Sequence, residues 1–173
     1  MAKGQAERLL DLIQDLLTEA GIGWRDLDAI GVGTGPGNFT GVRISVAAAR
    51  GLSLSLGIPA IGVTRLEALA HGLPRPVTVI EDARRDEVYV QTFATDETGP
   101  AQIMARDAFE RSGAVTENAA PAPALAPAFP LVVAIAHIAA SLITQTQPRP
   151  SPFYLRGADA APPSDPPPVI LDA

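Results

Sequence analysis

Apolar residues at the start of the chain recur at helical spacing. Between residues 5 and 20 they fall three or four positions apart, and charged or amide side chains occupy the opposite side. Gly21 interrupts this pattern, so we predict an amphipathic helix over residues 5–20. Leu12 widens the apolar stripe to an arc of roughly 160°, which exceeds what one packing neighbour requires. Part of this helix therefore has apolar surface available for a second contact.

A strand, a loop, a helix and a second strand follow in the pattern. The predicted bounds are a strand over 27–32, a glycine-rich loop over 33–38, a helix over 40–56 and a strand over 59–63. Gly57 ends the long helix, and Thr64 with Glu67 forms a capping box for a short helix that reaches about His71. This order predicts two parallel strands in an α/β layer.

Beyond Pro74 the pattern becomes strand-like. Residues 77–81 and 87–94 flank a charged turn over 82–86, which predicts an antiparallel hairpin. Residues 131–144 predict a helix that is apolar on most sides, and residues 153–156 are typical of a docking segment. The expected organisation is a first lobe over 1–73, a smaller second lobe over 74–157 and an extended or disordered proline-rich tail over 158–173.

Charge and composition exclude several classes of function. The chain has 173 residues and a formal charge of −6, and its basic residues do not cluster, so direct tRNA or other nucleic-acid binding is not expected. With no cysteine it has neither disulfides nor thiolate metal sites, which fits the cytoplasm. No apolar stretch reaches the roughly 20 residues of a membrane span.

The glycine-rich loop has two interpretations. Gly35 and Gly37 lie between a strand and a helix, where converging backbone N–H groups can hold a nucleotide phosphate. The Lys-Ser/Thr ending of a phosphate-binding P-loop is missing, however, which favours an architectural turn.

The helix over 40–56 also has two interpretations, because it is apolar nearly all round. Arg43 and Arg50 are its only charged residues, so a second cover is expected on its outer side. That cover is either a partner protein or another part of this chain. The candidate interface residues on the first and second long helices are Leu9, Leu12, Ile13, Leu16, Val42, Ile44, Ser45, Ala48, Ala49 and Leu52.

Several segments carry a resemblance to a known family. They are GPGNFTGVRI at 35–44, ARGL at 49–52, GIP at 57–59 and VTRLEAL at 63–69, with weaker echoes in AERL at 6–9, DARRDEVY at 82–89 and PFYLR at 152–156. Together they resemble the TsaB/YeaZ family. The resemblance implies an α/β fold of the actin, Hsp70 and sugar-kinase ATPase type, built from ribonuclease H-like lobes. Family members begin with further strands, so we expect the first lobe to be truncated here.

The resemblance also implies that the chain is not an enzyme. In the catalytic relative TsaD, the segment equivalent to residues 65–69 carries two histidines one helical turn apart, which share a metal ion. Arg65 and Leu69 stand at those positions, and neither can be a metal ligand. His71 and His137, the only histidines, are expected to have surface or packing roles, and the charges over 82–86 are expected to form a solvated turn. No cofactor is expected.

The implied function is that of a partner subunit. The resemblance predicts a heterodimer with TsaD through the first two long helices, with the ATPase TsaE completing the complex, and formation of the threonylcarbamoyl group on N6 of adenosine 37 in tRNAs that read ANN codons. Without TsaD the same helices are expected to pair as a homodimer. The alternative is a glycoprotease-like peptidase, or an ATPase, that acts on its own.

Overall fold

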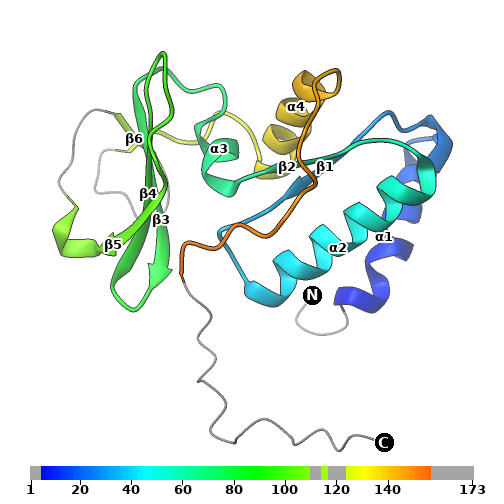
Figure 1. The fold of residues 1–173 in the computed structure, drawn as a ribbon, viewed down its shortest axis with the longest axis horizontal. Helices are drawn as coiled ribbons and strands as arrows, with labels where there is room; N and C mark the ends of the chain where they lie inside the picture. The colour runs from blue at the N-terminus through cyan, green and yellow to red at the C-terminus, as the bar shows by residue number, and fades with distance from the viewer. Residues whose placement is uncertain (1–4, 110–113, 117–123, 157–173) are drawn as a thin grey trace, which may run out of the picture.

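Two β-sheets organise the molecule (Figure 1). The computed structural model describes residues 5–109, 114–116 and 124–156. The first sheet pairs β1 (Ile30–Gly33) with β2 (Ala60–Val63) in parallel, with Ile30 opposite Ala60. The second sheet has the strand order β5-β4-β3-β6. Its strands are β3 (Val77–Arg84), β4 (Glu87–Phe93), β5 (Gln102–Ala105) and β6 (Ala114–Thr116).

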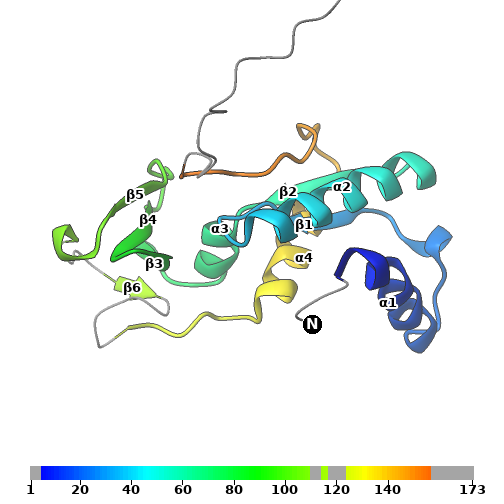
Figure 2. The same ribbon diagram turned by 90° about the horizontal axis from the view of Figure 1, so that it is seen from below.

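Two helices cover the first sheet, one on each face (Figure 2). α2 (Phe39–Leu56) connects β1 to β2, and its Val46 and Ala49 pack against Val32 of β1. α4 (Leu131–Leu142) covers the other face and approaches closely at Gly31, where an added Cβ would lie 2.9 Å from the Cβ of Ala139. The chain thus returns to the first sheet after building the second.

Local chemistry fixes the ends of α2 and α3. The side chain of Asn38 accepts a hydrogen bond from the Gly41 N–H at 2.8 Å, which caps the start of α2. Gly57 ends the helix in the left-handed conformation at φ 70°, where glycine is favoured. α3 (Arg65–Ala70) begins with the predicted capping box of Thr64 and Glu67.

The main core lies between α3 and the second sheet. Leu66 and Leu69 of α3 are buried together with strand residues such as Val77, Val79 and Phe93. The first five residues of β3 are all buried, whereas buried residues recur at every second position in most of β4, and Val77 pairs with Phe93. The antiparallel β3–β4 hairpin predicted from the sequence is therefore confirmed.

α1 (Gln5–Glu19) lies at the end of the molecule away from the second sheet (Figure 1). Leu17, which is 8% exposed, is the only buried residue among its described side chains. A short 3-10 helix, Trp24–Asp26, follows, and the Trp24 indole N–H donates to the side chain of Gln14 at 2.6 Å. This bond folds the connection to β1 back onto the helix.

Most predicted elements are confirmed, with shifted ends. The strand predicted over 27–32 forms at Ile30–Gly33, and β3 continues through the predicted turn to Arg84. The helix predicted over 131–144 ends at Leu142, and β5, β6 and two short 3-10 helices were not predicted. The proline-rich tail over 158–173 lies outside the described residues.

The division into lobes at residues 72–76 stays a prediction, although one sheet lies on each side of it. α4 falls in the predicted second lobe but packs on the first sheet. Within the described residues, no helix is long and apolar enough to cross a membrane.

Candidate functional site

The apolar residues of α1 form two rows along the helix. Leu9, Ile13 and Leu17 are spaced four residues apart and form the more buried row. Leu12 and Leu16 form a second row and are 42% and 55% exposed. The wide stripe predicted from the sequence therefore has an inner part that packs and an outer part that contacts solvent. Leu10, which the sequence-based list of interface residues left out, is 50% exposed.

α2 shows a similar division. Ala49 is 4% exposed and packs with Val46 against the first sheet, so this candidate interface residue belongs to the core. Val42 packs partly against the same cluster. The other candidates on this helix, Ile44, Ser45, Ala48 and Leu52, are half-buried. Leu54, which was not among the predicted interface residues, is the most exposed large apolar side chain of the described residues, at 84%.

The glycine-rich loop uses its backbone groups within the protein. Thr34 is buried, and its N–H donates to the carbonyl of Val63 at 2.9 Å. The carbonyl of Gly35 accepts from the Arg65 N–H at 2.7 Å, and the carbonyl of Thr34 accepts from the Phe153 N–H at 2.8 Å. Of the two candidate nucleotide residues, Gly35 is buried and Gly37 is exposed. These contacts favour the architectural interpretation of the loop.

Arg65 and Leu69 have structural partners in place of a metal ion. The guanidinium of Arg65 forms a two-point ion pair with Glu81, in which Nη2 lies 2.8 Å from Oε1. Leu69 is 5% exposed and lies in the main core. In the part of the chain that the structure describes, no group of three or more His, Cys, Asp or Glu residues is arranged to hold a metal ion. The residues present at these positions therefore do not fit a metal site.

The two histidines, far apart in the sequence, meet where α3 packs on α4. The ring centroids of His71 and His137 are 5.8 Å apart, and Phe129 lies against both, at 5.6 and 4.9 Å. His71 is half-buried and His137 is exposed. This aromatic cluster fits the packing role expected from the sequence, but sequence spacing gave no signal that the rings are neighbours.

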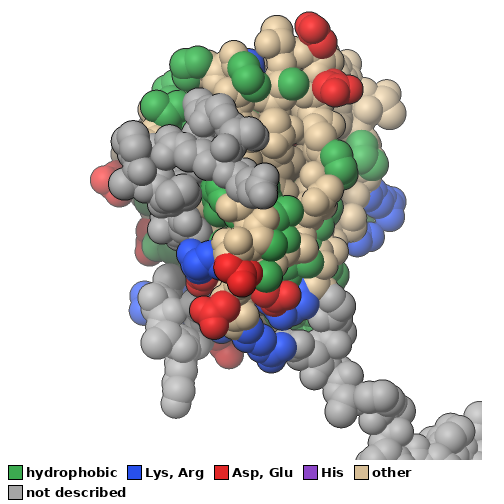
Figure 3. Space-filling view, turned by 90° about the vertical axis from the view of Figure 1, so that its left-hand side faces the viewer, with side chains coloured by type: hydrophobic (Ala, Val, Ile, Leu, Met, Phe, Trp, Pro, Cys, Tyr) green, Lys and Arg blue, Asp and Glu red, His purple; other side chains and the backbone are tan. Residues whose placement is uncertain are grey.

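The β3–β4 turn is charged and conformationally unusual. Arg84, Arg85 and Asp86 have φ angles of 63°, 53° and 56°, in the left-handed region that glycine and asparagine favour. Side chains of both charges gather on the face that the second sheet presents (Figure 3). The predicted solvated turn is thus present, but three consecutive left-handed residues were not anticipated.

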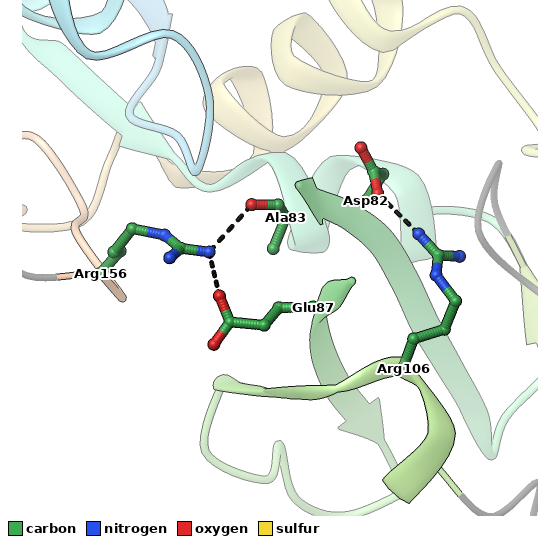
Figure 4. A network of polar contacts seen from close by, with 5 residues as sticks. All are labelled: Asp82, Ala83, Glu87, Arg106 and Arg156. Atoms are coloured by element: carbon green, nitrogen blue, oxygen red, sulfur yellow. Dashed lines mark hydrogen bonds and ion pairs between the residues drawn. The ribbon is translucent and has the colours of Figure 1, made fainter. Parts of the chain in front are cut away.

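Two arginines from distant segments hold this turn (Figure 4). Arg106 donates to the Asp82 carboxylate at 2.6 Å, and its backbone N–H donates to the Asp86 carbonyl at 2.8 Å. Arg156 donates to the Ala83 carbonyl at 3.0 Å and pairs with the Glu87 carboxylate. The hydrogen bond to Glu87 raises the pKa of Arg156 above its ordinary value, so this guanidinium stays charged.

Comparison with protein-family models gives a match over residues 1–149. The matching model is described as TsaD, tRNA N6-adenosine threonylcarbamoyltransferase. A curated relative, the tRNA threonylcarbamoyladenosine biosynthesis protein TsaB of Escherichia coli K12, is 42% identical over 98 residues, which are 54% of this chain and 42% of that protein. This chain thus spans less than half of that relative's length. An uncharacterized protein of Mycobacterium tuberculosis is 36% identical over 168 residues, covering 93% of this chain and 79% of that one.

Solved structures with a similar fold include YeaZ and a protein similar to it. A Pseudomonas aeruginosa protein described as uncharacterized with similarity to peptidase YeaZ superimposes with a TM-score of 0.64 at 28% identity, over 87% of this chain and 84% of that chain. YeaZ from the same organism superimposes with a TM-score of 0.53 at 35% identity, over 62% of this chain and 55% of that chain. The mixed α/β architecture is therefore shared with YeaZ structures.

Proposed function

Because this chain belongs to the TsaB/YeaZ family, we propose that it is a non-catalytic subunit that binds a TsaD-type catalytic partner. Its role is then in forming the threonylcarbamoyl group on N6 of adenosine 37 in tRNAs that read ANN codons. The catalytic partner supplies the chemistry and this chain supplies a docking surface. The proposed site of action is the cytoplasm.

The exposed apolar row of α1 is the observation that carries this proposal. Leu12 and Leu16 stand one helical turn apart and are about half exposed. Leucine side chains in contact with water cost free energy, about 25 cal/mol for each Å² of apolar surface, and a partner helix removes that cost. On α2 the exposed Leu54 and the half-buried Ala48 and Leu52 extend the proposed surface.

The residues at 65 and 69 support the non-catalytic role. The side chain of Arg65 forms an ion pair with Glu81, and that of Leu69 is buried in the main core. Neither side chain can act as a metal ligand. In this proposal the chain has a fold of the actin and Hsp70 type, and an ion pair and core packing take the place of catalytic groups at these two positions.

Other partners follow from charge and symmetry. A formal charge of −6 disfavours direct contact with tRNA phosphates, so tRNA binding is assigned to the catalytic partner. The ATPase TsaE is proposed as the third component. Without the catalytic partner, the apolar rows pair with those of a second copy and form a homodimer of two-fold symmetry.

Co-purification with the TsaD protein of the same organism tests the proposal. Leu16→Lys places a charge in the exposed apolar row and is expected to abolish the complex while circular dichroism stays unchanged. Asp11→Lys is the matched control, because Asp11 is an exposed residue on the polar side of the same helix. Retention of the complex by Leu16→Lys would show that α1 is not the interface. ATP or peptide turnover by the chain alone would contradict the non-catalytic role.

Sedimentation at micromolar concentration tests the homodimer. The unmodified chain is expected to sediment as a dimer, and Leu16→Lys as a monomer. A monomer for the unmodified chain would contradict self-association through these helices.

A further inference from the structure

The segment at residues 150–156, hereafter the strap, runs across the molecule from the first sheet toward the β3–β4 turn (Figures 1 and 2). Its first residue, Pro150, is buried. It lies close to Gly62 of β2, where an added Cβ would come within 3.4 Å of the Pro150 Cβ. The strap therefore begins in direct contact with the first sheet.

The middle of the strap lies on the glycine-rich loop. The Phe153 N–H donates to the Thr34 carbonyl at 2.8 Å. A Cβ added to Gly35 would lie 3.2 Å from the Phe153 carbonyl oxygen, so a side chain at this position would crowd the strap. The loop thus has an occupant that belongs to the same chain.

The next residue, Tyr154, reaches the first turn of α2. Its hydroxyl accepts a hydrogen bond from Nε of Arg43 at 2.8 Å, and its ring lies 5.2 Å from the ring of Phe39. The Arg43 guanidinium lies 3.8 Å from the Phe39 ring centroid, which is the geometry of a cation–π contact. Three side chains from two distant segments therefore stack together at the start of α2.

The end of the strap is anchored in the second sheet. Leu155 packs against the main core, and Arg156 holds Ala83 and Glu87 at the base of the β3–β4 turn (Figure 4). Left-handed residues other than glycine store strain that persists only where surrounding contacts maintain it. Arg156 supplies such contacts from the side of the strap, as Arg106 does from the side of β5.

We propose that the strap couples the conformations of two regions. One region is the glycine-rich loop together with the start of α2, and the other is the strained β3–β4 turn. One short segment contacts both regions, through Phe153 and Tyr154 in its middle and Arg156 at its end. Releasing the Arg156 end frees the segment whose Phe153 N–H holds Thr34 and whose Tyr154 hydroxyl holds Arg43. Conversely, a movement at the start of α2 displaces the strap and so weakens the contacts of Arg156 with the turn. This inference holds whether or not α2 binds a partner.

Amide hydrogen exchange on the full chain, resolved by mass spectrometry, tests the coupling. Arg156→Ala is expected to speed exchange several-fold at the turn over residues 83–87 and also at residues 34–43, which Arg156 does not contact. Arg149→Ala is the matched control, since Arg149 is an exposed arginine directly before the strap. Its exchange pattern is expected to equal that of the unmodified chain. Faster exchange confined to the turn would overturn the proposal.

Tyr154→Phe tests the same coupling from the opposite end. This change removes the hydroxyl that accepts from Arg43 and keeps the ring against Phe39, so the fold is expected to be retained. Faster exchange is expected at the start of α2 and, through the strap, at residues 83–87. An effect limited to α2 would show that the two regions behave independently. If Arg156→Ala fails to fold, Arg156→Lys takes its place in the comparison.

Discussion

Arg65 of α3 and Glu81 of β3 form a two-point ion pair that joins the short helix to the second sheet. The side chain of Glu81 is 9% exposed, whereas that of Arg65 is 34% exposed. The buried carboxylate depends on its partner, because removing one member of a buried pair leaves the other poorly solvated. Arg65 thus has a structural role in this chain.

Glu81→Gln is expected to lower the free energy of unfolding by about 1–3 kcal/mol, measured by urea denaturation. The partial exposure of Arg65 keeps the loss below that of a fully buried pair. Asp82→Asn is the neighbouring control. This change weakens the ion pair between Asp82 and Arg106, whose side chains are 47% and 45% exposed, respectively. It is expected to lower the free energy of unfolding by less than about 1 kcal/mol. Equal losses for both variants would show that burial does not distinguish the two pairs.

Gly31→Ala is expected to destabilise the protein by about 1–3 kcal/mol, because the new methyl group meets Ala139 of α4 at 2.9 Å. Thermal unfolding measures the loss. The second change Ala139→Gly removes the facing methyl group, so the double variant is expected to recover part of the loss. If Gly31→Ala has no effect, α4 does not pack this closely on β1.

Two glycine-to-alanine changes are expected to act in opposite directions. At Gly35, with φ 103° and the Phe153 carbonyl nearby, alanine is expected to cost about 1–3 kcal/mol. At Gly51, inside α2 with nothing within 4 Å of an added Cβ, alanine is expected to add about 0.5–1 kcal/mol of stability. Chemical denaturation of both variants measures the difference. Stabilisation by Gly35→Ala would contradict the tight contact between loop and strap.

Asp86→Gly is expected to raise the free energy of unfolding by about 1 kcal/mol, because glycine adopts a φ of 56° without the steric cost that a Cβ imposes. Asp86→Ala is the control: it removes the carboxylate but retains the Cβ, so it should not bring this gain. A gain of the same size from alanine would assign the effect to charge and not to backbone strain.

The sequence predicts elements well where a stop signal follows a periodic pattern. Gly21 and Gly57 limit the two long helices, and the Thr64–Glu67 capping box begins α3 as expected. The second sheet was only half predicted. β5 is short and has exposed ends, so it carries little of the apolar alternation on which strand prediction depends.

Contacts between distant segments were the part that sequence patterns missed. Nothing in the spacing of His71 and His137 places their rings 5.8 Å apart, since that proximity depends on how α4 packs against α3. Ala49 appeared to be a surface residue because α2 is apolar all round, and only its position over Val32 shows that it faces inward. The apolar pattern of a sequence identifies which helices bury surface. In a helix that is apolar all round, it does not show which side of the helix faces the core.

The position of α4 in the chain has a consequence for synthesis on the ribosome. Both strands of the first sheet that the structure describes have emerged once β2 is translated, but the helix that covers its second face is translated long afterwards, following the whole β3–β4 hairpin. Until then the face of the first sheet that packs on α4 is open to solvent, and a nascent chain at this stage exposes apolar side chains such as Val63 to chaperones and aggregation. Folding of the N-terminal part is therefore completed after, and not before, the central hairpin has formed.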